Sequence, residues 1–187
     1  MSDSQGASAQ APAQMTIVSG LMLLGLLAVA VVVFEYFGGS FLGLKSFFAS
    51  FTLLWYWSTV EKAEFKGLVP AVLGSLVGVG LAWQMQYCLG HFGANGLIFG
   101  LIPIVVALFV VIMNWAPIAV NGAAMLFLTV LGAPAFAASK VDFIELCEAI
   151  VIGAAFFAAV VYLAMMYVNM RAKAKAPGGA MAARAEA

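Results

Sequence analysis

The stretch LIFGLIPIVVALFVVIMNW, which runs from Leu97 to Trp115, decides the fold class because it contains no charged side chain. A helix needs about 20 mostly apolar residues to cross the hydrocarbon core of a bilayer, and this stretch is close to that length. Five other stretches are also mostly apolar and about as long: Thr16–Phe37, Phe41–Thr59, Gly67–Leu89, Ile118–Phe136 and Phe143–Met170. The sequence therefore predicts an all-α, polytopic membrane helical bundle with about six transmembrane helices.

The composition also indicates that lipid is the main partner of the chain. Of the 187 residues, 65% are hydrophobic and 9% are charged, and the mean hydropathy is +1.10. A typical soluble domain is about half apolar and about a quarter charged, so a soluble globular domain is excluded. The formal net charge of zero argues neither for nor against nucleic acid, and no nucleic-acid partner is expected.

The length predicts one membrane domain between two tails. Residues 1–15 are rich in Ser, Ala and Gln and lack the basic start of a signal peptide, so we expect a disordered N-terminal tail. Residues 16–170 form the predicted transmembrane domain. Residues 171–187 are rich in Ala, Gly and charge, which predicts a disordered cytoplasmic tail.

Two segments interrupt the apolar pattern. Gly38-Gly39 is predicted to end the first helix, and Ala116-Pro117 the fourth, because the residue before a proline avoids the helical conformation. The stretches Phe41–Thr59 and Ile118–Phe136, which follow these breaks, are short and polar at their starts. Each is therefore either a full span or a re-entrant segment.

The positions of Lys and Arg predict the orientation, since cytoplasmic loops are enriched in these residues. With six spans, both tails share a side with the loop from Glu61 to Lys66. That side collects most of the basic residues: Lys62, Lys66, Arg171, Lys173, Lys175 and Arg184. Lys45 and Lys140 lie on the other side. Both termini are therefore predicted to be cytoplasmic, whereas a five-span arrangement would place the N-terminus outside.

A shift of the chain against itself by about 78 residues reveals a possible internal repeat. The shift places Lys62-Ala63-Glu64-Phe65 on Lys140-Val141-Asp142-Phe143, and the Gly38-Gly39 break on Ala116-Pro117. Each half would then contain three helices. An odd number of spans gives the halves opposite topology, so the pattern predicts a 3+3 inverted repeat of the kind found in transporters. Chance matching of small apolar residues is the alternative.

Ionisable groups at membrane depth are costly and point to function. Lys45 lies near the start of the second stretch, and it either serves a solute pathway, with Glu35 as its ion-pair partner, or reaches the nearby interface. Glu145 and Glu148 share one face of the sixth helix. They could bind a cation or relay a proton, or they could complement the helix dipole.

Uncharged polar residues complete the candidate pathway. Asn114 and Asn121 flank the Ala116-Pro117 break, where they could contact a ligand or cap the helix ends. Thr52 and Thr129 could line the pathway or bond back to their own helices. No nucleophile–base pair, phosphate loop or metal-ligand spacing is present, so we expect no enzyme, no cofactor and no metal.

Three segments carry a resemblance to a known family: Phe65-Lys66-Gly67-Leu68, the glycine-rich helix that runs to Trp83, and the Gly/Ala/Thr-rich stretch Asn121–Phe136. The chain resembles the bacterial inner-membrane family called domain of unknown function 1097, over roughly Gly38 to Tyr167. The resemblance implies a multi-pass bacterial inner-membrane protein, distantly similar to the membrane parts of aromatic-acid exporters. It carries over no catalytic residue, and the long polar N-terminal tail departs from the family pattern.

The sequence thus predicts a small inner-membrane transporter or channel that works as a homo-oligomer. Six spans in 19.6 kDa leave little room for a wide path within one copy, and the scarcity of buried charge favours a small neutral or weakly charged solute. The alternative is a non-transporting scaffold or accessory subunit of a larger complex.

Overall fold

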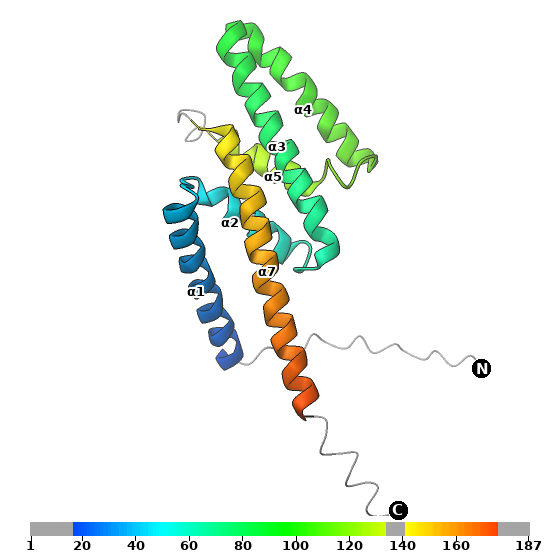
Figure 1. Cartoon of the computed structure of the whole chain (residues 1–187). Helices are drawn as coiled ribbons and strands as arrows, with labels where there is room; N and C mark the ends of the chain where they lie inside the picture. The colour runs from blue at the N-terminus through cyan, green and yellow to red at the C-terminus, as the bar shows by residue number, and fades with distance from the viewer. Residues whose placement is uncertain (1–16, 134–140, 176–187) are drawn as a thin grey trace, which may run out of the picture.

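The computed structural model of the chain describes residues 17–133 and 141–175 (Figure 1). These residues form six α-helices and one 3-10 turn: α1 Ile17–Phe41, α2 Phe47–Thr59, α3 Phe65–Phe92, η1 Gly93–Asn95, α4 Gly96–Met113, α5 Gly122–Leu131 and α7 Phe143–Lys175. The all-α prediction is confirmed for this part of the chain. The tail 1–15, the end of the predicted stretch Ile118–Phe136, and Lys140 and Arg184 lie outside the described residues.

Three of the described helices are long and apolar enough to cross a membrane: Phe65–Phe92, Gly96–Met113 and Phe143–Val168. In α1, the shorter segment Leu27–Phe41 is apolar. α2 has 13 residues and α5 has 10. At 1.5 Å per residue they are about 20 and about 15 Å long, against a hydrocarbon core of about 30 Å. Neither short helix crosses the core by itself, so residues 17–133 and 141–175 do not confirm six full spans.

The first predicted break is wrong. Gly38 and Gly39 lie inside α1, and the chain turns only after Phe41, where Gly43 has a φ of +67°. A Cβ at Gly38 would lie 2.9 Å from a ring carbon of Phe47, so this glycine allows α1 to approach the start of α2 closely. The glycine pair therefore marks a packing contact rather than a helix end.

The other boundaries agree better with the sequence. α4 ends at Met113 because Asn114 adopts the left-handed conformation, with a φ of 53°. The turn between α3 and α4 is shorter than the gap between the predicted stretches that end at Leu89 and begin at Leu97. This is because α3 continues through His91 to Phe92. α7 begins at Phe143 as predicted and runs to Lys175, so the predicted C-terminal tail starts as helix.

Two long antiparallel helices, α3 and α7, form the centre of the molecule (Figure 1). α3 contacts α2, α4, α5 and α7, while α7 contacts α1, α2 and α3. The core around these two helices contains the largest fully buried side chains, among them Phe34, Leu53, Trp57, Phe127 and Ile150. Burial of these apolar groups, at about 1.5–3 kcal/mol each, fixes the short helices against the long ones.

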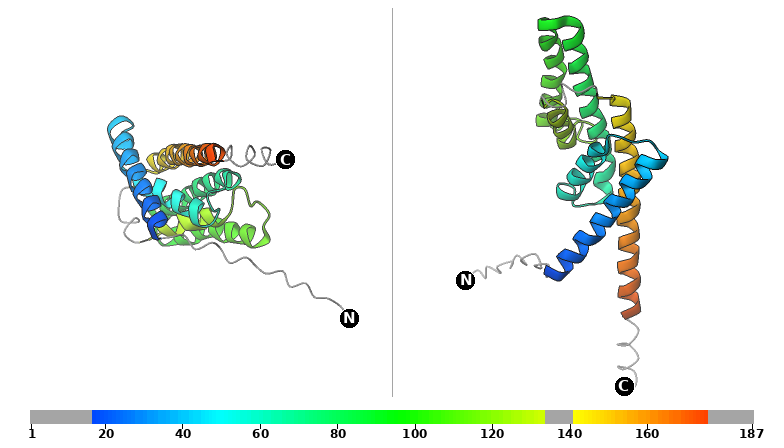
Figure 2. Two further views of the ribbon diagram at one scale, coloured as in Figure 1. Left: turned by 90° about the horizontal axis from the view of Figure 1, so that it is seen from below. Right: turned by 90° about the vertical axis from the view of Figure 1, so that its left-hand side faces the viewer.

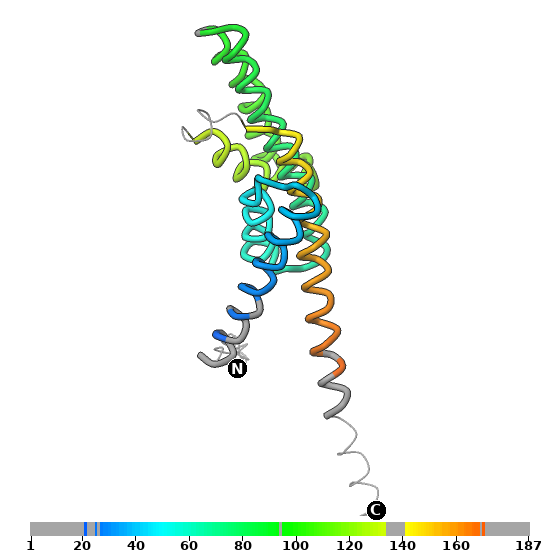
Figure 3. The backbone as a smooth tube through the Cα atoms, turned by 60° about the vertical axis from the view of Figure 1, so that its left-hand side comes forward, coloured from blue at the N-terminus to red at the C-terminus, as the bar shows by residue number. Residues whose placement is uncertain are grey.

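The molecule is elongated, because α3 and α7 are staggered along their common direction (Figure 2). The hairpin of α3 and α4 forms one end, and the start of α1 and the end of α7 form the other, as the backbone trace in Figure 3 also shows. The short helices α2 and α5 lie near the middle. The first and last described helices therefore reach the same end of the molecule.

Candidate functional site

The N-terminus of α5 is closed by the side chain of Asn121, which precedes the helix. Its Oδ1 accepts hydrogen bonds from the amides of Ala123 at 3.0 Å and Ala124 at 3.4 Å. Its Nδ2 donates to the carbonyl oxygen of Pro70 in α3 at 2.8 Å and to that of Pro117 at 3.1 Å. One amide group therefore caps α5 and also ties it to α3.

Two glycines of α3 make room for this contact. A Cβ at Gly74 would lie 2.1 Å from Oδ1 of Asn121. A Cβ at Gly78, one turn later, would lie 2.4 Å from the carbonyl oxygen of Ala124 and 2.8 Å from Cβ of Phe127. Small residues one turn apart let membrane helices approach closely. Gly74 and Gly78 of this glycine-rich helix are thus explained by the seat of α5.

Tyr56 of α2 also reaches the start of α5. Its side chain is 7% exposed, and a Cβ at Gly122 would lie 3.0 Å from its hydroxyl oxygen. Gly122 therefore leaves room for the Tyr56 ring at the start of α5.

The N-terminus of α2 is capped from another helix. Oε1 of Glu145, in the first turn of α7, accepts hydrogen bonds from the amides of Lys45 at 2.5 Å and Ser46 at 2.7 Å. α7 is capped by Asp142, whose Oδ1 accepts from the amide of Ile144 at 2.9 Å. A carboxylate at a helix N-terminus is favoured by the helix dipole. Glu145, although it belongs to α7, therefore stabilises the positive N-terminal end of the α2 dipole.

A second contact holds α2 on α7. The hydroxyl of Ser50 donates to the carbonyl oxygen of Ala149 at 2.6 Å, and Ser50 is fully buried. A Cβ at Gly153, one turn beyond Ala149, would lie 2.5 Å from Cβ of Ser50. Each short helix is thus seated on a long helix through a polar contact and a glycine.

The predicted charged residues do not meet as a cluster. Glu35, Lys45 and Glu148 are exposed, and Glu145 is half-buried. Only Lys45 and Glu145 are brought together, through the backbone amide of Lys45 rather than through its ammonium group. The carboxylate at the start of α2 is that of Glu145 rather than the predicted Glu35.

The predicted uncharged residues act mainly on their own helices. The hydroxyls of Thr52 and Thr129 each donate to the carbonyl oxygen four residues earlier, at 2.7 Å, and Asn114 ends α4. Only Asn121 makes a polar contact with a different helix. Their roles in a solute pathway remain predictions.

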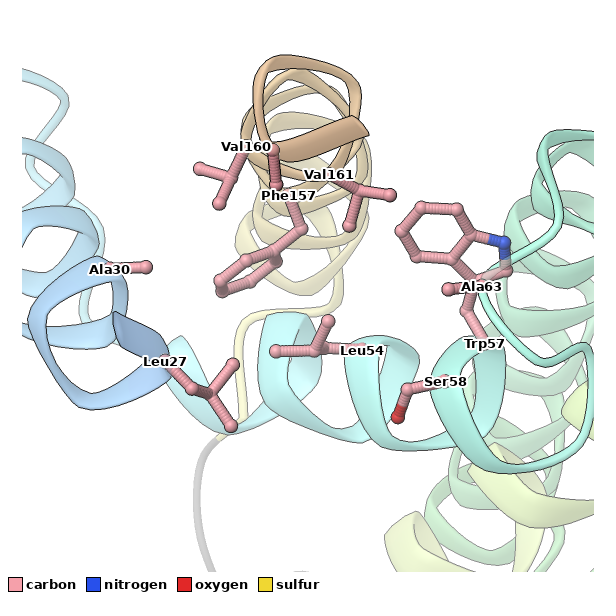
Figure 4. A pocket seen from close by; sticks show the side chains of 10 residues that line it. Leu27, Ala30, Leu54, Trp57, Ser58, Ala63, Phe157, Val160 and Val161 are labelled. Atoms are coloured by element: carbon pink, nitrogen blue, oxygen red, sulfur yellow. The ribbon is translucent and has the colours of Figure 1, made fainter. Parts of the chain in front are cut away.

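Of the apolar cavities in the described part of the chain, one lies between α1, α2 and α7 and another between α3, α4 and α5. The first, called here the α1–α2–α7 cavity, has a volume of about 270 Å³. Its lining is shown in Figure 4: Leu27, Ala30, Leu54, Trp57, Ser58, Ala63, Phe157, Val160, Val161 and Ala164. The second, the α3–α4–α5 cavity, has about 280 Å³ and is lined by Ala82, Met85, Gln86, Leu89, Ile104, Leu128, Leu131 and Gly132. Neither is lined by Lys45 or Asn121.

Sequence reasoning missed several polar residues in the interior. Ser50 and Tyr56 had only their position in an apolar stretch to mark them. Gln84 of α3 donates to the carbonyl oxygen of Phe99 at 3.2 Å, while its own buried Oε1 has no hydrogen-bond partner. A glutamine within an otherwise apolar stretch was a usable signal, since polar side chains in such segments mark interhelical contacts.

The remaining reactive side chains do not form a site within residues 17–133 and 141–175. No group of three His, Cys, Asp or Glu residues in this part of the chain could hold a metal ion. His91 is exposed and stacks on Tyr87, with a ring-centroid distance of 4.0 Å. Cys88 is buried and Cys147 is half-buried, and both are free thiols.

Comparisons with known proteins leave the function to be argued from the fold. No protein-family model, no curated protein and no solved structure matches the chain. The resemblance to domain of unknown function 1097 therefore stays a prediction, and three helices long enough to cross a membrane indicate a membrane-embedded protein.

Proposed function

We propose that the protein is a small transporter or channel of the bacterial inner membrane, built as an inverted repeat, for a small neutral or weakly charged solute. The observation that carries the proposal is the exchange of short helices between the halves. α2 of the first half packs on α7 of the second half, and α5 of the second half packs on α3 of the first.

The order of the helices supports the repeat. Each half has a long helix, a short helix and a second long helix: α1, α2 and α3, then α4, α5 and α7. The third helices begin at Phe65 and Phe143, the spacing that the sequence repeat predicts. The contacts of α1 with α7 and of α4 with α3 follow the same exchange.

The two cavities support the repeat independently. The shift that matches Phe65 with Phe143 also pairs three lining positions: Ala82 with Val160, Gln86 with Ala164, and Gly132 with Leu54. Each cavity is enclosed by a first helix, a short helix and the third helix of the other half. Matching cavities are expected if the halves share one design and not if the sequence match is accidental.

Such an arrangement suits transport, because transporters of this build use broken or short helices whose ends lie inside the membrane. Here the N-termini of α2 and α5 are held by Glu145 and Asn121. We place the solute path along the junction of these two helices with α3 and α7, with Lys45 at one entrance. Thr52, Thr129, Asn114, Glu35 and Glu148 remain further candidates. No cofactor is proposed.

A homo-oligomer is also proposed, because a chain of 19.6 kDa leaves little room for a wide path within one copy. Much of α4 is exposed and apolar, including Ile98, Val105 and Ile112 at 62%, 60% and 78%. This surface can face lipid or another copy of the chain. The same observation favours the second candidate function, a non-transporting scaffold or accessory subunit, in which α4 packs on a different protein.

Solute flux into purified proteoliposomes distinguishes the two functions. Swelling is followed by light scattering with glycerol, urea and acetate as small neutral or weakly acidic probes. We expect faster swelling than in protein-free vesicles for at least one probe. The Lys45→Met variant should lose this flux, whereas Lys66→Met, which removes an exposed lysine at the start of α3, should keep it.

The absence of flux from correctly folded protein with all three probes would favour the scaffold function. Flux that survives Lys45→Met would support the transporter function but would show that Lys45 does not lie on the solute path.

Both termini are proposed to be cytoplasmic, which the uneven distribution of basic residues supports.

A further inference from the structure

We propose that the α1–α2–α7 cavity binds one acyl chain of an anionic phospholipid from the leaflet on the side of the chain termini. The inference concerns a lipid site, which goes beyond solute transport. Its evidence comes from the polar groups of the lining, the size of the cavity, its opening and the end of α7.

The lining offers no free side-chain hydrogen-bond donor to a polar ligand, because its two polar side chains already donate to backbone carbonyl oxygens. The hydroxyl of Ser58 donates to the carbonyl oxygen of Trp55 at 3.1 Å. Nε1 of Trp57 donates to the carbonyl oxygen of Glu64 at 2.8 Å. The remaining lining residues are Ala, Leu, Val and Phe. The occupant must therefore be apolar where it enters the cavity.

The cavity is large enough for part of a hydrocarbon chain. Its volume is about 270 Å³, whereas an engineered apolar cavity of about 150 Å³ already binds benzene. Left empty, the lining would lose dispersion contacts. Figure 4 shows Leu27 of α1, Leu54 of α2 and Phe157 of α7 on three sides of the space.

The cavity opens toward apolar surroundings. α1 and α7 meet where the rings of Phe34 and Phe157 lie 5.1 Å apart between centroids, and the two helices then separate toward the start of α1 and the end of α7 (Figure 2, right). Leu27 on one helix is 47% exposed, and Leu163 on the other is 61% exposed. In a membrane such a wedge faces lipid chains rather than water, so the occupant is drawn from the leaflet.

The sequence at the end of α7 favours an anionic headgroup. The helix continues from Val161 in the cavity to its final turns, which contain Arg171, Lys173 and Lys175. At 1.5 Å per residue, Val161 and Arg171 are about 15 Å apart along the axis, which equals half of a hydrocarbon core of about 30 Å. A lipid with its phosphate near Arg171 would therefore place its acyl chain end in the cavity. Basic segments at this depth attract anionic lipids.

Quenching of Trp57 by brominated lipids tests the site, since Trp57 is buried from bulk lipid but lines the cavity. The full chain would keep Trp57 as its only tryptophan, with the exposed Trp55, Trp83 and Trp115 changed to Phe. Vesicles would contain chain-brominated phosphatidylglycerol in plain phosphatidylcholine, or the brominated form of phosphatidylcholine in plain phosphatidylglycerol. One basic residue attracts an anionic lipid by about 1 kcal/mol, which is about fivefold in affinity. We therefore expect the quenching site to prefer phosphatidylglycerol over phosphatidylcholine by at least about fivefold.

Two alanines of α7 provide matched variants. Ala164→Phe fills the cavity and should abolish the preferential quenching, whereas Ala159→Phe alters an exposed position and should retain it. Equal quenching by both lipids, or quenching unchanged by Ala164→Phe, would overturn the proposal. In the unaltered tryptophan background, native mass spectrometry gives a second measurement. Retained phosphatidylglycerol should fall with Ala164→Phe and not with Ala159→Phe, and none of these results depends on solute flux.

Discussion

Substitution of Gly74 by alanine should unseat α5, because the new Cβ would occupy the place of the Asn121 amide. The three nearest atoms to that Cβ all belong to this amide: Oδ1 at 2.1 Å, Cγ at 2.8 Å and Nδ2 at 2.9 Å. The amide must move, and its hydrogen bonds to the carbonyl oxygen of Pro70 and to the amide of Ala123 are lost.

The cost can be worked from these bonds. Loss of an N-cap costs about 1 kcal/mol, and loss of the hydrogen bond to Pro70, whose carbonyl oxygen keeps its helical donor in α3, costs about 0.5–1.5 kcal/mol. Gly74→Ala should therefore lower the free energy of unfolding by about 1.5–2.5 kcal/mol. In an Asn121→Ala background these bonds are already absent. The same substitution should there be neutral or stabilise by about 0.5–1 kcal/mol, the usual gain of alanine over glycine in a helix.

The assay is a double-mutant cycle measured by reversible unfolding in mixed detergent micelles. Gly80→Ala is the matched control, since Gly80 is exposed in the same helix and nothing lies within 4 Å of its Cβ position. This control should stabilise by about 0.5–1 kcal/mol. Equal effects of Gly74→Ala and Gly80→Ala, or a cost at Gly74 that persists without the Asn121 amide, would refute the reasoning.

Three further outcomes follow from the same contacts. Glu145→Ala should lower the free energy of unfolding by about 1–3 kcal/mol in the micelle assay because the start of α2 loses its acceptor, whereas the exposed Glu148→Ala should change it by less than about 0.5 kcal/mol. Gly153→Ala should cost about 1–3 kcal/mol by overpacking, and Ser50→Gly but not Ser50→Ala should relieve it, since the closest atom is the Cβ of Ser50. Reporter fusions at Gly93 and at the C-terminus should lie on opposite sides of the membrane, and the same side for both would contradict the proposed topology.

The helical class and most boundaries could be predicted, because apolar stretches long enough to cross a bilayer have one stable backbone solution. Asn121 could be predicted as a cap from its position after a proline break. The start of α7 at Phe143 coincides with the first residue of an apolar stretch in the sequence.

The lengths of α2 and α5 could not be predicted, since a short helix buried among other helices is as apolar as a full span. Gly38 and Gly39 read as a break because sequence alone does not reveal the ring of Phe47 that packs against them. Glu145 caps a helix that lies far from it in the sequence, so its role depends on the tertiary structure.

The central claim is that each short helix is held by a long helix of the other half of the proposed repeat, and a disulfide between α3 and α5 tests it most directly. In a Cys88→Ala, Cys147→Ala background, Gly74→Cys and Asn121→Cys should form an intramolecular disulfide in native membranes. The Cγ of Asn121, whose place the sulfur takes, lies 2.8 Å from the Cβ position of Gly74. In a disulfide with an S–S bond of about 2.0 Å, the Cβ of one cysteine lies about 3 Å from the sulfur of the other, so the two positions suit the bond.

The proposed repeat supplies the comparison, because its shift of 78 residues places Gly74 of α3 on Ile152 of α7. If α5 were instead held by the long helix of its own half, Asn121→Cys would link to Ile152→Cys. The exchange predicts the disulfide with Gly74→Cys and none with Ile152→Cys, measured by mass spectrometry of oxidised membranes. The reverse pattern would contradict the account.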